Sequence, residues 1–283
     1  SLKDLLSKIT KKTKALMLIH VLGNSTNMDL LMRIVKKYNL ILIEDTCESL
    51  GSKYKNKYLG SFGDFSTFSF YYSHQITSIE GGMLCCKDKN DADIIKAMRS
   101  HGWSKDHSKK NTLEKKYKNI NKAFLFINSG FNLRPTDIQA AIGSSQFKSL
   151  DHFIKKRSIN RKKIINSLKS DRRWNDQVRF LYENEHVKAS WFGIAILMNS
   201  KYKHNKNKIL YKLDKHGIEN RPIISGNFIK QPAVKKYKLI KNSETFYNSN
   251  LIHNLGFFIG LKIEEIKDIE LKKFNNIFFK AFE

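Results

Sequence analysis

The chain contains 283 residues, which is enough for one large or two modest domains with a buried core. Apolar residues make up 41% of the sequence and aromatic residues 12%, so the composition is that of a globular protein and not of a disordered one. No apolar run approaches the roughly 18 residues that a membrane span needs, and we therefore expect no membrane partner.

The charge is strongly basic. The 52 Lys and Arg residues outweigh 26 Asp and Glu residues and give a formal net charge of +26. Clustered basic side chains would favour nucleic-acid binding, because they release counterions from phosphates. Here the lysines are spread over the whole chain without a zinc-finger or RNA-binding motif. We interpret the charge as a solvated surface that helps to attract a phosphorylated ligand, and keep a basic nucleic-acid-binding protein as a remote alternative.

The three cysteines are Cys47, Cys85 and Cys86. Two are adjacent in sequence, and no pair has the spacing of zinc ligands. This pattern disfavours a disulfide scaffold and a cysteine metal cluster, so we expect no metal. A reducing compartment fits best, and the sequence therefore favours the cytoplasm.

The first predicted elements form a βαβ unit. Apolar runs at residues 15–21 and 40–43 predict two buried strands, and Asn27 has the character of an N-cap for a helix between them. Such a unit implies a parallel sheet, and parallel sheets bind ligands beyond the carboxyl ends of their strands. Asp45 follows the second strand and is therefore expected at such an end.

Strands and helices then alternate along the chain. We expect the domain boundary in a long helical region, which gives a large domain over residues 1–168 and a small one over residues 169–283. The predicted elements are turns over 51–63, strands over 65–72, 83–86 and 189–198, helices over 91–100, 136–169, 206–215 and 264–281, and a polar loop over 103–122.

Six segments occur in an order that resembles the DegT/DnrJ/StrS family of nucleotide-sugar aminotransferases. They are IEDTCESLG at 43–51, GSFGD at 60–64, FSFY at 68–71, EGG at 80–82, RSHG at 99–102 and GFNLRPTDIQAA at 130–141. The resemblance implies the α/β fold of pyridoxal-phosphate-dependent transferases of fold type I, which is aspartate aminotransferase-like, with a mostly parallel sheet and a smaller C-terminal α+β domain. By family comparison the chain begins roughly a hundred residues late, so we expect the N-terminal part of the large domain to be missing.

One position departs from the aminotransferase pattern. Members that transaminate carry a Schiff-base lysine five residues after a serine, whereas here Ser69 is followed by His74. An imidazole cannot form that covalent bond, but it titrates near neutral pH and can act as a general base. Histidine at this position resembles the sugar 3-dehydratases of the family. The alternative is a structural histidine in an inactive or truncated aminotransferase relative.

The dehydratase resemblance implies a substrate class. These enzymes remove the C3 hydroxyl of a 4-keto-6-deoxyhexose nucleotide in deoxysugar and lipopolysaccharide O-antigen biosynthesis. A CDP-sugar subtype carries an iron–sulfur cluster on cysteines in the loop after the RSHG segment. The loop over 103–122 has no cysteine, so we expect no iron–sulfur cluster and a GDP-linked sugar.

The resemblance also assigns roles to residues around the cofactor, pyridoxal 5'-phosphate or pyridoxamine 5'-phosphate. Asp45 would pair with the pyridinium nitrogen, Glu48 would lie near the ring face, and Ser69 would bind the phosphate. His74 would remove a proton from the cofactor carbon C4′. L-Glutamate would supply the amino group that is finally released as ammonia.

Three further residues complete the expected site. Asn132 would reach the phosphate of the cofactor in a neighbouring subunit, which implies a homodimer. The segment RPIISGNF at 221–228 also resembles the dehydratase branch. Arg221 and Asn227 in this segment are the candidates for binding substrate phosphate or sugar hydroxyls.

Overall fold

The computed structural model describes residues 1–240 and 246–283, and its contacts divide the chain into two compact units. The first unit consists of residues 1–20 and 26–150, and the second of residues 21–25 and 151–283. Each unit has its own four-stranded sheet.

The division falls at the beginning of helix α6 (Leu150–Lys169), whereas the sequence placed it at residue 168, near the end of the same helix. The contacts of α6 give the reason. The Asn160 side-chain amide donates to the carbonyl oxygens of Lys262 (2.9 Å) and Glu264 (2.7 Å), which tie the middle of the helix to the second unit.

The sheet of the first unit is mostly parallel, as the resemblance implied. Its order is β1-β2-β5-β6; β1, β2 and β5 run parallel, and β6 is antiparallel to β5. The strands are β1 (Ala15–Ile19), β2 (Ile41–Asp45), β5 (Phe65–Ser69) and β6 (Gly82–Cys86).

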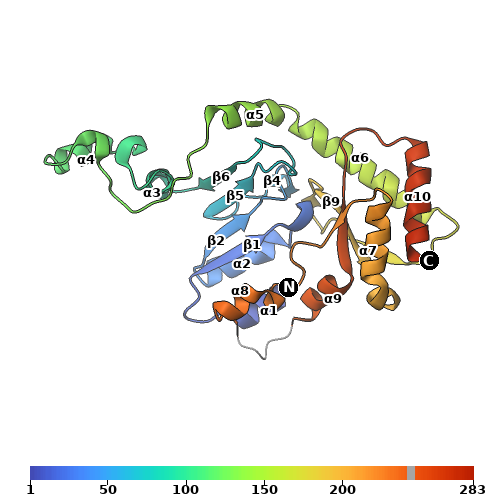
Figure 1. Cartoon of the computed structure of the whole chain (residues 1–283). Helices are drawn as coiled ribbons and strands as arrows, with labels where there is room; N and C mark the ends of the chain where they lie inside the picture. The colour runs from blue at the N-terminus through green and yellow to red at the C-terminus, as the bar shows by residue number, and fades with distance from the viewer. Residues whose placement is uncertain (241–245) are drawn as a thin grey trace. The chain divides into compact units, whose positions relative to one another are not determined.

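Helix α2 (Met28–Lys37) joins β1 to β2 and confirms the predicted βαβ unit. It begins after Asn27, whose side-chain oxygen accepts a hydrogen bond from the Leu30 amide at 3.0 Å. The apolar residues of α2 recur at helical spacing and are buried. Figure 1 shows this helix running alongside β1 and β2.

Several connections contain more structure than the sequence indicated. The turns over 51–63 include a short hairpin, the loop over 103–122 contains a helix, and the helix expected over 136–169 is two helices. Lys110 and Glu114, an ion pair at i and i+4 (3.8 Å), support the helix in that loop. The remaining elements of the first unit are α1 (Leu2–Lys8), β3 (Lys53–Tyr54), β4 (Lys57–Tyr58), α3 (Lys89–Arg99), η2 (Ser104–Asp106), α4 (Lys110–Lys116), η3 (Lys122–Phe124) and α5 (Asp137–Phe147).

The second unit has an antiparallel sheet in the order β10-β11-β9-β7. Its core includes Ile194, Ile196, Phe257 and Phe278, and this unit is the α+β part that the resemblance implied. Its elements are η1 (Val21–Gly23), α6, β7 (Val178–Phe180), β8 (Val187–Lys188), β9 (Gly193–Met198), η4 (Ser200–Asn205), α7 (Lys206–Lys215), β10 (Asn220–Arg221), η5 (Phe228–Lys230), α8 (Pro232–Lys236), α9 (Tyr247–Leu255), β11 (Gly256–Gly260) and α10 (Asp268–Phe282).

In the described part of the chain, no helix combines the length and the apolar character that crossing a membrane requires.

Alanine substitutions at a buried and at an exposed position of α10 test how strongly packing stabilises the second unit. Phe278 is fully buried, whereas Ile269 is 75% exposed. We expect Phe278→Ala to lower the free energy of unfolding by about 3–5 kcal/mol, because it removes a ring and leaves a cavity. Ile269→Ala should change it by less than about 0.5 kcal/mol. Urea unfolding followed by tryptophan fluorescence measures both, and equal losses would contradict this account of the core.

Candidate active site

Asp45 and Ser69 lie at the carboxyl ends of neighbouring parallel strands. Asp45 is the last residue of β2, Ser69 is the last residue of β5, and the register pairs Asp45 with Thr67. Parallel strands present their carboxyl ends at one edge of the sheet, which is where α/β folds bind ligands. The fold therefore brings these two predicted site residues to the same edge.

The Asp45 carboxylate is held from its own turn. The Cys47 amide donates to Asp45 Oδ1 at 3.1 Å, and Cys47 Sγ lies 3.8 Å from Thr67 Oγ1. Burial and the neighbouring Asp45 raise the pKa of the Cys47 thiol to about 11. The thiol is therefore protonated at neutral pH, and Cys47 is not positioned as a thiolate nucleophile.

His74 lies in a turn after β5. Its backbone amide donates to the Tyr71 carbonyl at 3.0 Å, and its ring meets the Tyr71 ring nearly edge to face, with centroids 6.0 Å apart. Burial lowers the pKa of His74, and the negative charge of Asp45 opposes this effect in part. The imidazole is therefore neutral at pH 7 and able to accept a proton. The influence of Asp45 on His74 also means that the fold brings the proposed acid and base near each other.

Ser69 and Glu48 lie in segments that are linked to the His74 turn. The Tyr71 amide donates to Ser69 Oγ at 3.3 Å. The buried side-chain amide of Gln75 donates to the Glu48 carbonyl. Gln75 was not singled out from the sequence, and only its place beside His74 could have drawn attention to it.

Asn132, Arg221 and Asn227 have local partners. Asn132 is exposed and accepts a hydrogen bond from Arg134 Nε at 3.2 Å, and Arg221 of the second unit is exposed and paired with Glu219 (2.7 Å). Asn227 is buried in the second unit. Its side-chain oxygen accepts from the Ile229 amide, and its amide donates to Asn250. A substrate group would have to compete with these bonds to use Asn227.

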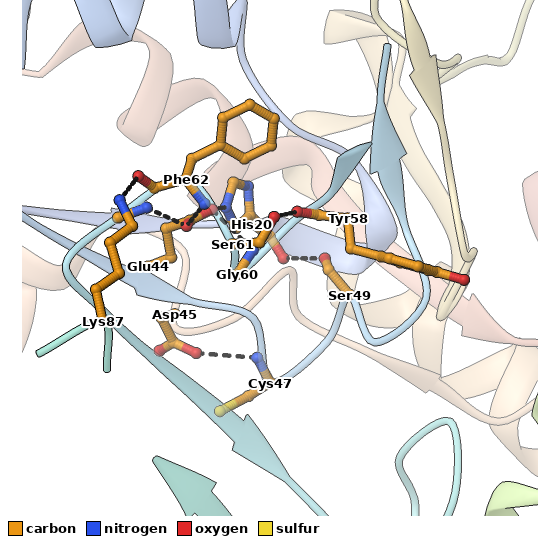
Figure 2. Close-up of polar contacts among 11 residues, drawn as sticks. His20, Glu44, Asp45, Cys47, Ser49, Tyr58, Gly60, Ser61, Phe62 and Lys87 are labelled. Carbon is orange, nitrogen blue, oxygen red and sulfur yellow. Dashed lines mark hydrogen bonds and ion pairs between the residues drawn. The ribbon is translucent and has the colours of Figure 1, made fainter. Parts of the chain in front are cut away.

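A buried acid, Glu44, directly precedes Asp45 in the sequence. Glu44 is fully buried, and its carboxylate accepts hydrogen bonds from the backbone amides of Gly60 (2.8 Å), Phe62 (2.7 Å) and Gly63 (2.6 Å). Figure 2 shows Gly60 and Phe62 beside Glu44. Burial alone would raise the pKa of Glu44, but His20 and the amides of Gly63 and Gly60 outweigh it, and the pKa is lowered. Glu44 was not selected as a site residue from the sequence. The feature that could have drawn attention to it is an acidic residue at the end of an otherwise apolar strand.

The first unit also contains an apolar cavity of about 710 Å³. Its lining includes Phe68 of β5, Phe70 directly after β5, Met83 of β6, and Gln139 and Phe147 of α5. None of the predicted site residues lines it. Phe68 and Phe70, which flank Ser69 in the chain, do line it.

The model of the DegT/DnrJ/EryC1/StrS aminotransferase family matches residues 1–271. The chain belongs to this family. The predicted membership is thus confirmed, and the match extends over both structural units.

Similar curated proteins include 3-dehydratases and a GDP-perosamine synthase. GDP-4-keto-6-deoxy-D-mannose 3-dehydratase of Escherichia coli O55:H7 is 33% identical over 261 residues, which cover 92% of this chain and 66% of that protein. The enzyme of the same description from Yersinia pseudotuberculosis is also 33% identical, covering 92% and 65%. GDP-perosamine synthase of E. coli O157:H7 is 35% identical, covering 79% and 55%. The chain thus spans slightly less than two thirds of the length of the dehydratases it matches.

Solved structures agree on the fold. E. coli GDP-4-keto-6-deoxy-D-mannose-3-dehydratase with bound hydrated PLP superposes with a TM-score of 0.86 at 30% identity, covering 98% of this chain and 70% of that one. A structure of GDP-4-keto-6-deoxymannose-3-dehydratase with a trapped PLP-glutamate geminal diamine has the same TM-score and identity. The predicted fold class is therefore confirmed.

The pKa of His74 provides a test of the site geometry. We expect an NMR titration of the histidine side chains to place His74 below its ordinary pKa. Asp45→Asn should lower this pKa further, because the negative charge that favours the imidazolium is lost. Asp106→Asn, at an exposed carboxylate that pairs with Arg99, serves as the control and should leave the His74 pKa unchanged. An unchanged His74 pKa in Asp45→Asn would mean that the two side chains do not face each other.

Proposed function

We propose that this protein is a pyridoxal/pyridoxamine phosphate-dependent nucleotide-sugar 3-dehydratase that acts on a GDP-linked 4-keto-6-deoxyhexose. The observation that carries the proposal is His74, a neutral imidazole close enough to Asp45 to respond to its charge, at the position where aminotransferases of the family carry lysine. The relatives described as GDP-4-keto-6-deoxy-D-mannose 3-dehydratases support the choice of sugar and nucleotide.

The side chains at the sheet edge fit the proposed cofactor chemically. Asp45 offers a carboxylate for a pyridinium nitrogen, Ser69 offers a hydroxyl for a phosphate, and Glu48 lies in the turn that follows Asp45. When bound, the cofactor would supply a protonated ring that accepts electrons from the reacting carbon. The hydrogen bond from the Cys47 amide would keep the Asp45 carboxylate oriented toward this ring.

His74 is the proposed general base. A neutral imidazole accepts a proton, and His74 would accept it from C4′ of the cofactor. Unlike lysine, it forms no lasting covalent bond to the cofactor, which leaves the way open for loss of the C3 hydroxyl instead of transamination. L-Glutamate would supply the amino group and the two electrons and would leave as 2-oxoglutarate. The C3 hydroxyl would leave as water, and hydrolysis, which consumes one water, would release ammonia and a 4-keto-3,6-dideoxy sugar nucleotide.

The setting of the reaction follows from the same relatives. A relative described as lipopolysaccharide biosynthesis protein RfbH, from Salmonella typhimurium, is 32% identical and supports a role in lipopolysaccharide precursor synthesis. The three cysteines are free, and the loop after RSHG contains none of them, which supports a cluster-free enzyme in the cytoplasm. The second candidate is an inactive or truncated relative of the nucleotide-sugar aminotransferases. The similarity to GDP-perosamine synthase is the observation that favours it.

Turnover tests the proposal directly. With pyridoxal phosphate, L-glutamate and GDP-4-keto-6-deoxy-mannose, we expect release of 2-oxoglutarate and ammonia. His74→Asn should lower ammonia release by about 10²-fold or more while cofactor binding persists. His216→Asn, at an exposed histidine of the second unit, is the control and should retain full activity.

Other outcomes would reject the proposal. Formation of an amino sugar would indicate a transaminase, and cofactor binding without turnover would indicate the inactive relative. Salt-sensitive retention of DNA without cofactor uptake would indicate the nucleic-acid-binding alternative.

We further propose that the protein works as a homodimer. Large apolar side chains of the segment before and within α5 are half or more exposed, and a second copy of the chain would cover them: Phe124, Phe126, Phe131, Leu133, Ile138 and Phe147. Asn132 lies within this segment. It would reach the cofactor phosphate of the partner subunit, as the family resemblance implies.

Mixed dimers test this role of Asn132. Asn132→Ala and His74→Asn should each be nearly inactive alone. Mixed in equal amounts after reversible dissociation, they should regain about a quarter of the wild-type activity, because each mixed dimer holds one intact site. No recovery would show that Asn132 acts in its own subunit or not at all. Leu133→Glu should yield monomers in analytical ultracentrifugation, whereas Tyr211→Glu, at an exposed position on α7, should not.

A further inference from the structure

A buried hydrogen bond lies next to Asp45 in the sequence and joins His20 to Glu44. His20 Nε2 is 3.0 Å from Glu44 Oε2, and neither side chain is exposed to solvent. The same carboxylate accepts the amides of Gly60, Phe62 and Gly63, so four donors surround it (Figure 2). This arrangement satisfies a buried carboxylate that would otherwise be very costly.

The direction of the His20 bond follows from the charge of Glu44. Because the pKa of Glu44 is lowered, its carboxylate is ionised at neutral pH and only accepts hydrogen bonds. His20 Nε2 must therefore carry the proton. Among the described residues, the buried Nδ1 of His20 has no hydrogen-bond partner.

The backbone of His20 holds the end of β2. Its amide donates to the Asp45 carbonyl at 3.0 Å, and its own carbonyl accepts a hydrogen bond from the buried Ser49 hydroxyl at 2.6 Å (Figure 2). His20 thus joins the strand residue Asp45 to the turn that follows it. Since successive strand residues face opposite sides of the sheet, Glu44 is bonded on one side while Asp45 projects from the other.

The loop that binds Glu44 has little freedom. A Cβ on Gly63 would lie 2.6 Å from the Leu42 carbonyl oxygen, and one on Gly60, where φ is +86°, would lie 2.6 Å from the Phe68 ring. The loop therefore passes close enough to β2 and β5 for its amides to reach the carboxylate only because these residues lack side chains. Loop, acid and histidine form one tightly packed unit.

We propose that His20 and Glu44 are positioning residues for Asp45. Together they fix the backbone from which the Asp45 carboxylate projects, and they fix the Cys47 turn that orients it. The inference rests on the proposed function in one respect, the pairing of Asp45 with the pyridinium nitrogen. The geometry around Asp45 itself can be measured without any cofactor.

The experiment compares His20→Leu, His20→Gln and Glu44→Gln in the full chain with a matched control. The control is His107→Gln, because His107 lies 3.6 Å from the buried Asp93, which in turn accepts the Ser108 amide at 3.0 Å. Amide hydrogen exchange of the unliganded protein is the first measurement. His20→Leu should speed exchange at Gly60, Phe62, Gly63 and Cys47 by about tenfold or more.

His20→Gln retains a hydrogen-bond donor toward Glu44 and should keep most of the protection from exchange. Glu44→Gln should speed exchange at the amides of Gly60, Phe62 and Gly63. The control variant should speed exchange at Ser108 and leave Cys47 unchanged. If Cys47 keeps its protection in His20→Leu and Glu44→Gln, the pair stabilises the fold without positioning Asp45, and the proposal is wrong. If His20→Leu fails to fold, Glu44→Gln is compared with His20→Gln instead. Loss of protection at the Cys47 amide in Glu44→Gln but not in His20→Gln supports the proposal, and equal protection in both contradicts it.

The second measurement uses pyridoxamine phosphate labelled with ¹⁵N in its ring. The ring-nitrogen signal reports protonation, and we expect His20→Leu to shift it toward the unprotonated form, whereas the control should not. A wild-type chain that takes up no cofactor, or that leaves the ring unprotonated, would reject the proposed role of Asp45. The exchange data would still decide whether His20 and Glu44 position it.

Discussion

The buried carboxylate of Glu44 is the constraint on which the site depends. It lies at the end of an apolar strand, where an unpartnered charge would be very costly, and four hydrogen-bond donors make it tolerable. Meeting this requirement brings the end of β1, the loop over 60–63 and the end of β2 together. Asp45 follows Glu44 directly, and we propose that the hydrogen bonds of Glu44 set the position of Asp45.

The proposed base, His74, is placed by a different kind of contact. His74 is held in a turn after β5 by a backbone hydrogen bond and by the Tyr71 ring, and the Gln75 side chain ties the same turn to Glu48. Burial lowers the pKa of His74 and keeps the imidazole neutral, while Asp45 limits the extent of the shift. The charge of Asp45 thus acts on the pKa of His74, as is common where two titratable groups share a site.

The two units relate differently to the proposed function. Asp45, Glu48, Ser69, His74 and Asn132 all belong to the first unit, whereas Arg221 and Asn227 belong to the second. In the second unit the Asn227 side chain forms hydrogen bonds with Ile229 and Asn250, and Arg221 forms an ion pair with Glu219. The chemistry of the proposed reaction is accordingly concentrated in the first unit, and the roles of Arg221 and Asn227 stay predictions.

The sequence by itself determined the βαβ unit, the Asn27 cap and the family, because apolar periodicity, capping chemistry and ordered motifs are local properties of the chain. It also singled out His74 by its place after Ser69. It did not give the helix α4, the separation of α5 from α6, or the short strands β7, β10 and β11, since their formation depends on partners distant in sequence. Only the tertiary structure paired His20 with Glu44 and Gln75 with Glu48. These residues are 24 and 27 positions apart, and no local pattern states which buried polar groups will satisfy each other.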